Sequence, residues 1–281
     1  MRMRNLLGAA GVLTLSLASA PAMAQDDVSP GEEFTGFYVG GSVGYTVQNN
    51  DVGERIVFDG GQNGSFGDTI STVGGDNAFE PGFCNGASTG QDNFACRNDK
   101  DAIEYYGKVG FDMQMGKFVV GAVGEFGKSQ IRDSVSAFST TPAAYTLSRE
   151  IDWNAALRLR AGVVAGEQTL FYATGGGAYA KIDHSVYTIN NSANTFTVQG
   201  DDKAWGWQAG GGVEQKIGRN FSVGLEYIYS RYNDDDSSVR VGAGTADPAV
   251  NPFILAGGVD MTRDSNRFDF HSLRATAAFR F

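Results

Sequence analysis

A strict alternation of apolar and polar residues is the feature that most limits what this chain can fold into. In the last ten residues, 272–281, it places Leu273, Ala275, Ala277, Phe279 and Phe281 on one parity, and Arg274, Thr276, Ala278 and Arg280 on the other. A period of two directs these two sets to opposite faces of a β-strand. The same pattern recurs in seven further segments, at 37–47, 103–114, 118–126, 151–163, 169–182, 205–216 and 221–230. The sequence therefore predicts an all-β fold with eight strands.

The connections between these segments indicate how the strands are arranged. Three connections are very short and contain a glycine, at Gly116, Gly166 and Gly218. Four are long and polar, at about 48–100, 132–145, 185–202 and 233–265. Short and long connections alternate along the chain, which is typical of an up-and-down barrel in a membrane. We therefore expect an eight-stranded antiparallel transmembrane β-barrel with three short periplasmic turns, four long extracellular loops and both termini in the periplasm.

Charge indicates which parity of each strand faces the barrel interior. Alternation alone would also suit a soluble barrel with its apolar parity inward. The apolar parity here carries almost no charge in its central part and holds many bulky aromatic residues. An eight-stranded barrel has an interior only just wide enough for side chains. Small and charged residues fit that interior, whereas the aromatic residues fit a lipid environment. A closed sheet also pairs every backbone N–H and C=O group, which a membrane requires.

The charged residues of the inward parity are the candidate lumen residues. Seven are basic and six are acidic, a balance that favours a salt-bridged network closing the lumen and leaves a narrow channel as the alternative. They are Glu104, Lys108, Asp112, Glu125, Asp152, Arg158, Arg160, Lys181, Glu214, Lys216, Glu226, Arg274 and Arg280. The phase of 169–182 is the least defined: with Lys181 inward, the outward residues are Leu170, Tyr172, Ala178, Ala180 and Ile182.

The N-terminal residues predict export. Residues 1–24 have the basic start, apolar stretch and small-residue cleavage site of a secretory signal peptide. We expect 25–35 to be a periplasmic segment and 36–281 to be the barrel domain. Removal of the signal takes the net charge from −10 to −12, which excludes nucleic acid as a partner.

Cysteine, histidine and acidic residues are the candidates for chemical sites. Cys84 and Cys96 are the only cysteines, and in an exported chain they predict a disulfide. Two groups hold residue types used in hydrolysis, namely Asp183, His184 and Ser185, and Asp269, His271 and Ser272. Adjacent strand residues point to opposite faces, so His271 and Ser272 cannot meet, and we expect no enzymatic activity. The acidic run 234–236 and the acids of 48–100 lack calcium-loop spacing, so we expect solvated charge, no metal and no cofactor.

Four sequence stretches together carry a resemblance to a known family. They are G-F-Y-V-G-G-S-V-G-Y at 36–45, L-R-A-G to Y-A-T-G-G-G-A-Y across 159–179, G-W-Q-A-G-G-G-V-E at 206–214 and L-E-Y-I-Y at 225–229. Together they resemble the small porin-like and OmpA-like surface antigens in the outer membrane of Gram-negative alphaproteobacteria. The resemblance covers all the expected strands but not the loops, and the first loop is long for that group. It implies that the last strand, with Phe279 and Phe281, is a signal read by the barrel assembly machinery.

These observations together predict an integral outer-membrane protein with a structural and surface role. The alternatives are a narrow porin-like channel, and an adhesin or surface antigen that acts through the first loop, where Cys84 and Cys96 would hold an exposed tip. The expected partners are outer-membrane lipids, lipopolysaccharide and the assembly machinery, with host or matrix surfaces as a further possibility. Within the first loop, 55–58 and 68–73 look like short strands, so an added hairpin and a ten-stranded barrel form a second alternative for the fold.

Overall fold

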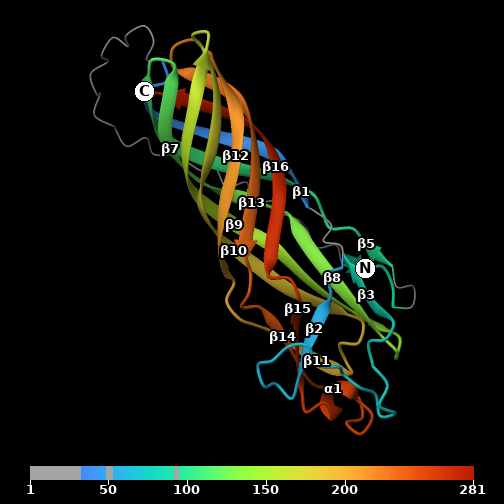
Figure 1. Ribbon diagram of the computed structural model, residues 1–281. Coiled ribbons are helices and arrows are strands. Elements are labelled where there is room, and N and C mark those ends of the chain that lie inside the picture. Colours follow the sequence, from blue (N-terminus) through green and yellow to red (C-terminus); the bar gives the residue numbers. More distant parts are fainter. Residues whose placement is uncertain (1–32, 49–52, 92–94) are drawn as a thin grey trace, which may run out of the picture.

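Eight strands close into a ring in which each strand is antiparallel to both neighbours (Figure 1). The computed structural model describes residues 33–48, 53–91 and 95–281. The expected signal peptide at 1–24 and most of 25–35 lie outside the described residues. In ring order the strands are β1 (Gly36–Gln48), β6 (Ala102–Met115), β7 (Phe118–Ser129), β9 (Ala143–Ala165), β10 (Thr169–Thr188), β12 (Lys203–Ile217), β13 (Phe221–Asn233) and β16 (Arg267–Arg280).

The three tight turns lie at one end of the ring, which we call the turn end. They join β6 to β7, β9 to β10 and β12 to β13. Gly116, Gly166 and Gly218 have positive φ angles of 62°, 67° and 78° in these turns, a conformation that glycine adopts without steric cost. The C-terminus lies at this end as well (Figure 1). The predicted up-and-down barrel is therefore confirmed, and we call its opposite end the loop end.

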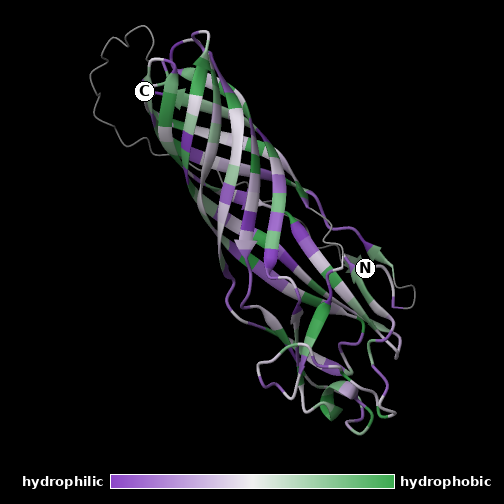
Figure 2. Cartoon of the chain, in the orientation of Figure 1, coloured by the Kyte–Doolittle hydropathy of each residue, from purple (hydrophilic) through white to green (hydrophobic). Residues whose placement is uncertain are grey.

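The apolar parity of the strands faces outward. Leu157 and Leu159 on β9 are 67% and 69% exposed, and Phe118 on β7 is 63% exposed. Figure 2 shows apolar and polar residues mixed along the barrel strands, as a wall with two unlike faces requires. Toward the loop end, two runs of ring contacts, one from β7 to β12 and one from β12 to β16, make up an outward aromatic belt. Its members are Phe126, Trp153, Tyr179, Trp205, Trp207, Tyr229, His271 and Tyr227.

The expected phase of β10 is wrong. Lys181 faces outward, whereas Leu170, Ala178, Ala180 and Ile182 are buried inside the barrel, and Tyr172 also points inward. The reason is steric. The rings of Phe171 and Tyr179 lie on the opposite parity and need the space outside the narrow barrel, whereas alanines fit within it.

The expected inward position of Asp152 is also wrong. The register between β9 and β10 shifts at Lys181 and Ile182, which pair with Trp153 and Ile151, so Asp152 is an extra residue in β9. Such a bulge reverses the parity of everything beyond it. Ile151 is consequently fully buried, and Asp152 lies outside, in contact with Lys128 and Lys181.

The long loops contain folded structure that the sequence pattern did not predict. β9 and β10 have 23 and 20 residues, about twice the length that crosses a bilayer, so their outer halves continue past the loop end. The other elements there are β2 (Ile56–Gly60), β3 (Gly82–Asn85), β4 (Ala87–Ser88), β5 (Cys96–Arg97), β8 (Arg132–Ser139), β11 (Asn194–Gln199), β14 (Ser238–Ala243), α1 (Pro252–Leu255) and β15 (Val259–Arg263). We call these elements, with the outer half of β9, the cap.

Two sheets build most of the cap. The main sheet continues from β9 through β8 to β3, and a separate sheet has the order β11-β14-β15-β2. The alternative of an added hairpin in the first loop is therefore wrong in its details. The segment 55–58 overlaps β2, but β2 pairs with β15, and 68–73 forms no strand. The expected loop at 132–145 is instead a β-hairpin of β8 and β9.

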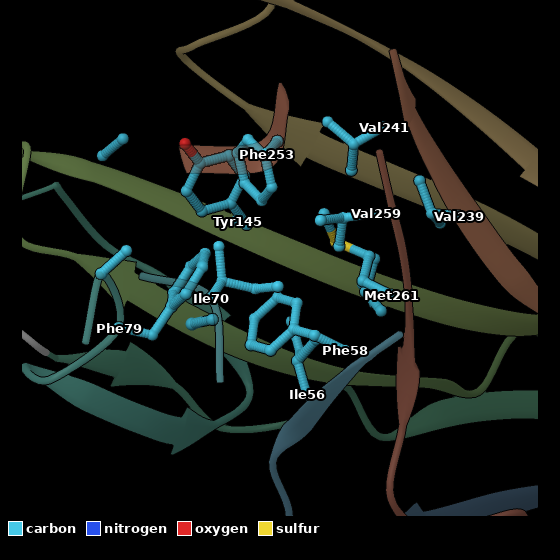
Figure 3. Packing of buried hydrophobic residues seen from close by; sticks show 14 of the residues in the cluster. Ile56, Phe58, Ile70, Phe79, Tyr145, Val239, Val241, Phe253, Val259 and Met261 are labelled. Atoms are coloured by element: carbon cyan, nitrogen blue, oxygen red, sulfur yellow. The ribbon is translucent and has the colours of Figure 1, made fainter. Parts of the chain in front are cut away.

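A hydrophobic core lies inside the cap and draws residues from all the long loops (Figure 3). Phe79 is at its centre: its ring stacks on Phe58 at a centroid distance of 4.4 Å and contacts Tyr145 and Phe253 at 5.7 and 5.9 Å. The core includes Ile56, Phe58, Ile70, Phe79, Val135, Tyr145, Leu147, Val239, Val241, Phe253, Val259 and Met261. Burial of this many large apolar side chains makes the cap a packed unit and not a set of separate loops.

Candidate functional site

The lumen of the barrel, from the turn end to the cap, is the candidate functional site. Nearest the turn end, Asp112, Arg160, Glu214 and Arg280 form a closed ring of alternating charge. Arg160 lies 2.7 Å from Glu214 and 3.3 Å from Asp112, and Arg280 lies 2.9 Å from Asp112 and 3.4 Å from Glu214. The Tyr172 ring stacks on the Arg160 guanidinium. Each charge is thus neutralised where burial would otherwise be costly.

A second ionic cluster lies deeper in the barrel and again contains equal numbers of acids and bases. Its members are Glu104, Lys108, Glu125, Arg158, Glu226 and Arg274. Arg158 lies 2.7 Å from Glu125 and 3.3 Å from Glu226. Arg274 lies 2.6 Å from Glu104 and its guanidinium stacks on the ring of Tyr106. The structure thus brings ten of the predicted lumen residues together in two clusters.

Lys216 and Phe34 lie at the turn end beyond these clusters. Lys216 donates a hydrogen bond to the backbone carbonyl of Glu33 and is not part of either cluster. Phe34 is fully buried among inward residues of the barrel, including Val119 and Leu170. Its backbone amide donates to Gln114 Oε1 at 2.9 Å, and its carbonyl accepts from Arg280 at 2.7 Å. An apolar side chain therefore closes the turn end, where sequence reasoning placed only a segment preceding the barrel.

The lumen toward the loop end is apolar, which differs from the expected polar interior. Fully buried Phe268, Phe270, Ile151 and Ile182 pack here with several alanines. Tyr232 joins this apolar layer to the ionic interior, since its hydroxyl accepts hydrogen bonds from Asn154 and Gln208. Sequence analysis placed Ile151 and Ile182 on the outer face, because it did not foresee the bulge at Asp152 or the phase of β10. Phe268 and Phe270 precede the alternating stretch 272–281 and were assigned to no face.

A third ionic group, which we call the mouth cluster, lies where the barrel meets the cap. It consists of Glu54, Asp99, Asp133, Arg149, His184, Asp234 and Arg263. Arg149 lies 2.7 Å from Asp133 and 3.2 Å from Asp234, and Arg263 lies 2.6 Å from Glu54 and 2.7 Å from Asp133. The cluster therefore connects stems of every long loop. Sequence analysis missed it because its residues lie far apart along the chain, in or next to the segments expected to be loops.

Electrostatics of the mouth cluster depend on an excess of acids over guanidinium groups. Burial raises the pKa of Glu54 to about 7, although Arg263 opposes the change. Burial and the nearby Asp133 raise the pKa of Asp99 to about 7. Burial acts in the same direction on Asp133, but Arg149 and Arg263 outweigh it and hold the pKa of that carboxyl below its usual value. The pKa values of Glu54 and Asp99 therefore lie near neutral pH.

The candidate catalytic groups do not assemble. His184 Nε2 lies 2.9 Å from Asp234, and Ser185 is exposed. His271 Nδ1 contacts the Tyr227 hydroxyl at 2.6 Å on the outer surface, whereas Ser272 is buried inside the barrel.

Residues considered for metal binding have other roles. Asp234 is buried and paired, so the expectation of a fully solvated run at 234–236 is wrong for its first member. No group of three or more potential metal ligands occurs in the part of the chain that the structure describes.

Cys84 and Cys96 form the predicted disulfide, between β3 and β5 in the cap.

The predicted assembly residues lie at the turn end. Phe279 and Phe281 are 47% and 70% exposed, and their ring centroids are 5.3 Å apart. The backbone amide of Phe281 donates to the carbonyl of Phe37, so the last residue still pairs with β1. Within the described ranges, helices long and apolar enough to cross a bilayer are absent.

Comparisons with known proteins agree with this geometry. The family model described as outer membrane protein beta-barrel domain matches residues 10–281. The 31 kDa outer-membrane immunogenic proteins of Brucella melitensis and Brucella suis are each 30% identical over 124 residues, which is 44% of this chain and 51% of theirs. The chain thus spans about half the length of the curated relatives it matches. Their names describe immunogenic proteins of the outer membrane.

Solved structures of Ail, the attachment invasion locus protein of Yersinia pestis, are also similar. One is a complex with the heparin analogue sucrose octasulfate. That structure is 12% identical, has a TM-score of 0.33, and the match covers 88% of this chain and 100% of Ail.

Proposed function

Because this chain belongs to the outer membrane protein beta-barrel domain family, we propose that it is a sealed membrane anchor that supports the envelope and holds a folded cap at the cell surface. It is an outer-membrane protein, and its relatives are named as immunogenic proteins of the outer membrane, which supports a surface role. The turn end faces the periplasm and the loop end faces outward. The observation that carries the proposal is the lumen itself, which is filled from Phe34 at one end to the mouth cluster at the other.

The filled lumen argues against transport and catalysis as the main role. An open pore normally shows segregated charge around water in a wider barrel. Here the two inner clusters are each neutral and an apolar layer follows them. The groups considered for catalysis are separated by the barrel wall or held by other partners. We therefore propose that the protein has no enzymatic activity.

The partners that we propose follow from this placement. Phe279 and Phe281 are the assembly signal, read at the free turn end before the barrel closes. Outer-membrane lipids and lipopolysaccharide surround the apolar outer wall. The cap, stiffened by its core and by the Cys84–Cys96 disulfide, is the surface available to host or matrix molecules.

A deletion strain tests the proposed role. We expect a strain that lacks the protein to release periplasmic contents or shed membrane blebs, and expression of the full chain to restore the envelope. An intact envelope combined with loss of uptake of one defined small solute would contradict the proposal and favour the channel alternative.

A further inference from the structure

The segment 33–35, directly before β1, folds back into the turn end of the lumen. The side chain of Phe34 packs against Val119, Val164 and Leu170 and is fully buried. These three residues come from β7, β9 and β10, and none of these strands is a neighbour of β1. The segment therefore enters the lumen and reaches across it, and does not simply extend the first strand.

Polar side chains of the barrel bind the backbone of this segment as they would bind a peptide. Gln114 on β6 accepts from the Phe34 amide at 2.9 Å, and its own amide donates to Thr35 Oγ1 at 3.0 Å. Lys216 on β12 donates to the carbonyl of Glu33. A buried backbone group without a partner would be costly, and here separate strands supply the partners.

Arg280 connects the docked segment to the pairing of β1 with β16, which we call the seam (Figure 1). From β16, its Nη1 donates to the carbonyls of Phe34 at 2.7 Å and Gly36 at 3.2 Å. Its Nη2 donates to Asp112 on β6 at 2.9 Å and to Glu214 on β12 at 3.4 Å. One buried guanidinium group thus joins the last strand of the chain to the start of the first.

Arg160 shows what is special about Arg280. From β9 it pairs with the same two carboxylates and is buried to a similar degree. It also lies 3.4 Å from the Tyr38 hydroxyl of β1. Within the described residues, however, no hydrogen bond joins Arg160 to the segment 33–35 or to β16. Of the two arginines in this charge ring, Arg280 is therefore the one that spans the seam.

The seam is the most demanding pairing of the barrel to form. Phe34 and Arg280 are 246 residues apart in the chain, whereas the strands joined by the three tight turns are neighbours in sequence. The entropy lost on closing a loop rises with its length, and contacts between distant segments tend to form late. A side-chain device that holds this pairing together therefore has a clear use.

We infer that the turn end of the lumen is a peptide-binding site whose occupant is the segment 33–35 of the same chain, and that the docked segment holds the seam closed through Arg280. The site recognises backbone carbonyls and one aromatic side chain. We call Phe34 and Arg280 the closure latch. The inference concerns only how the barrel closes, so it stands or falls separately from the proposed surface role.

Hydrogen exchange of the refolded full chain in detergent tests the latch. Arg280→Gln and the matched control Arg160→Gln each remove one guanidinium group from the same two carboxylates. The measured quantity is the exchange rate of amides that pair β1 with β16, divided by the rate of amides that pair β6 with β7. We expect Arg280→Gln to raise this ratio about tenfold, the effect of losing one charged hydrogen bond, and Arg160→Gln to leave it nearly unchanged. Equal ratios in the two variants overturn the inference.

Phe34→Ala tests whether the docked segment and Arg280 act together. We expect it to raise the same ratio, and the double variant with Arg280→Gln to exceed the larger single effect by little, because both changes open one latch. Phe253→Ala removes a buried side chain from the cap and should leave the ratio unchanged. Additive effects in the double variant, or an unchanged ratio in Phe34→Ala, contradict the inference. The heat-dependent gel mobility of folded barrels shows that each variant is folded.

Discussion

At the scale of single residues, the buried charges of the lumen affect the stability of the fold, because each depends on its ion-pair partners. Arg158 has fully buried ion pairs to Glu125 and Glu226, and Gln208 accepts a further hydrogen bond from it. Arg132, in contrast, pairs with Glu150 on the surface, where its side chain is 51% exposed. Removal of one member of a buried pair leaves an uncompensated charge, whereas a surface pair contributes little.

Arg158→Ala should therefore destabilise the protein by about 3–5 kcal/mol. Arg132→Ala should change the free energy of unfolding by less than about 1 kcal/mol. Urea unfolding of the refolded protein, followed by tryptophan fluorescence, measures both values. Equal losses in the two variants would show that the inner clusters do not behave as buried ion pairs.

The mouth cluster gives the cap a pH dependence. A carboxyl group whose pKa is raised in the folded state stabilises that state at low pH, and this contribution is lost as the pH rises through the raised pKa. For Glu54 and Asp99, this stabilising contribution is fully lost above about pH 7. Asp133, with its lowered pKa, acts oppositely and loses its contribution only below its ordinary value near 3.8.

We expect the cap to be tighter near pH 5 than near pH 8. Hydrogen exchange of β2 and β15, corrected for intrinsic rates, measures this difference. Glu54→Gln should reduce the difference, because the amide cannot ionise. Faster corrected exchange at pH 5 than at pH 8 would contradict the assigned direction.

At the scale of elements, the cap core should hold the loops together independently of the barrel. Phe79→Ala removes the central ring and should cost about 3–5 kcal/mol of cap stability. Limited proteolysis should then cut in the loops while the barrel strands remain protected. Phe83→Ala in β3, where the ring is 37% exposed, is the control and should leave the cleavage pattern unchanged.

The disulfide should act only on its own part of the cap. Cys84 and Cys96 close a short loop between β3 and β5, and a loop of this size contributes roughly 3 kcal/mol by chain entropy. Reduction should speed hydrogen exchange in β3, β4 and β5 and leave the thermal unfolding of the barrel unchanged. A lower barrel melting temperature after reduction would contradict this separation.

The sequence predicted the barrel elements better than the cap. Alternation identified the barrel strands, and glycines such as Gly116 identified the turns, because both signals are local. The phase of β10 failed where small residues such as Ala178 and Ala180 occupy one parity and give little contrast. The bulge at Asp152 and the core around Phe79 depend on pairing between distant segments, for which a local period of two carries no information.

At the scale of the whole molecule, the barrel continues into the cap (Figure 1). Buried side chains fill the barrel and pack the cap. The inner ionic clusters were predictable from inward charged residues such as Glu125 and Arg274, since their parity is unambiguous. Phe34 and the mouth cluster were not, because they come from segments outside any alternating pattern. Several of these layers close the lumen in series, and the proposed role depends on that closure.

Conductance in planar lipid bilayers tests that closure most directly. The full mature chain should insert and show no steady ion-conducting openings at neutral pH, and Phe34→Gly should not open a path while the inner clusters remain. Steady openings of the native chain that disappear in Arg158→Ala or Glu226→Ala would contradict the sealed barrel and show that the lumen conducts.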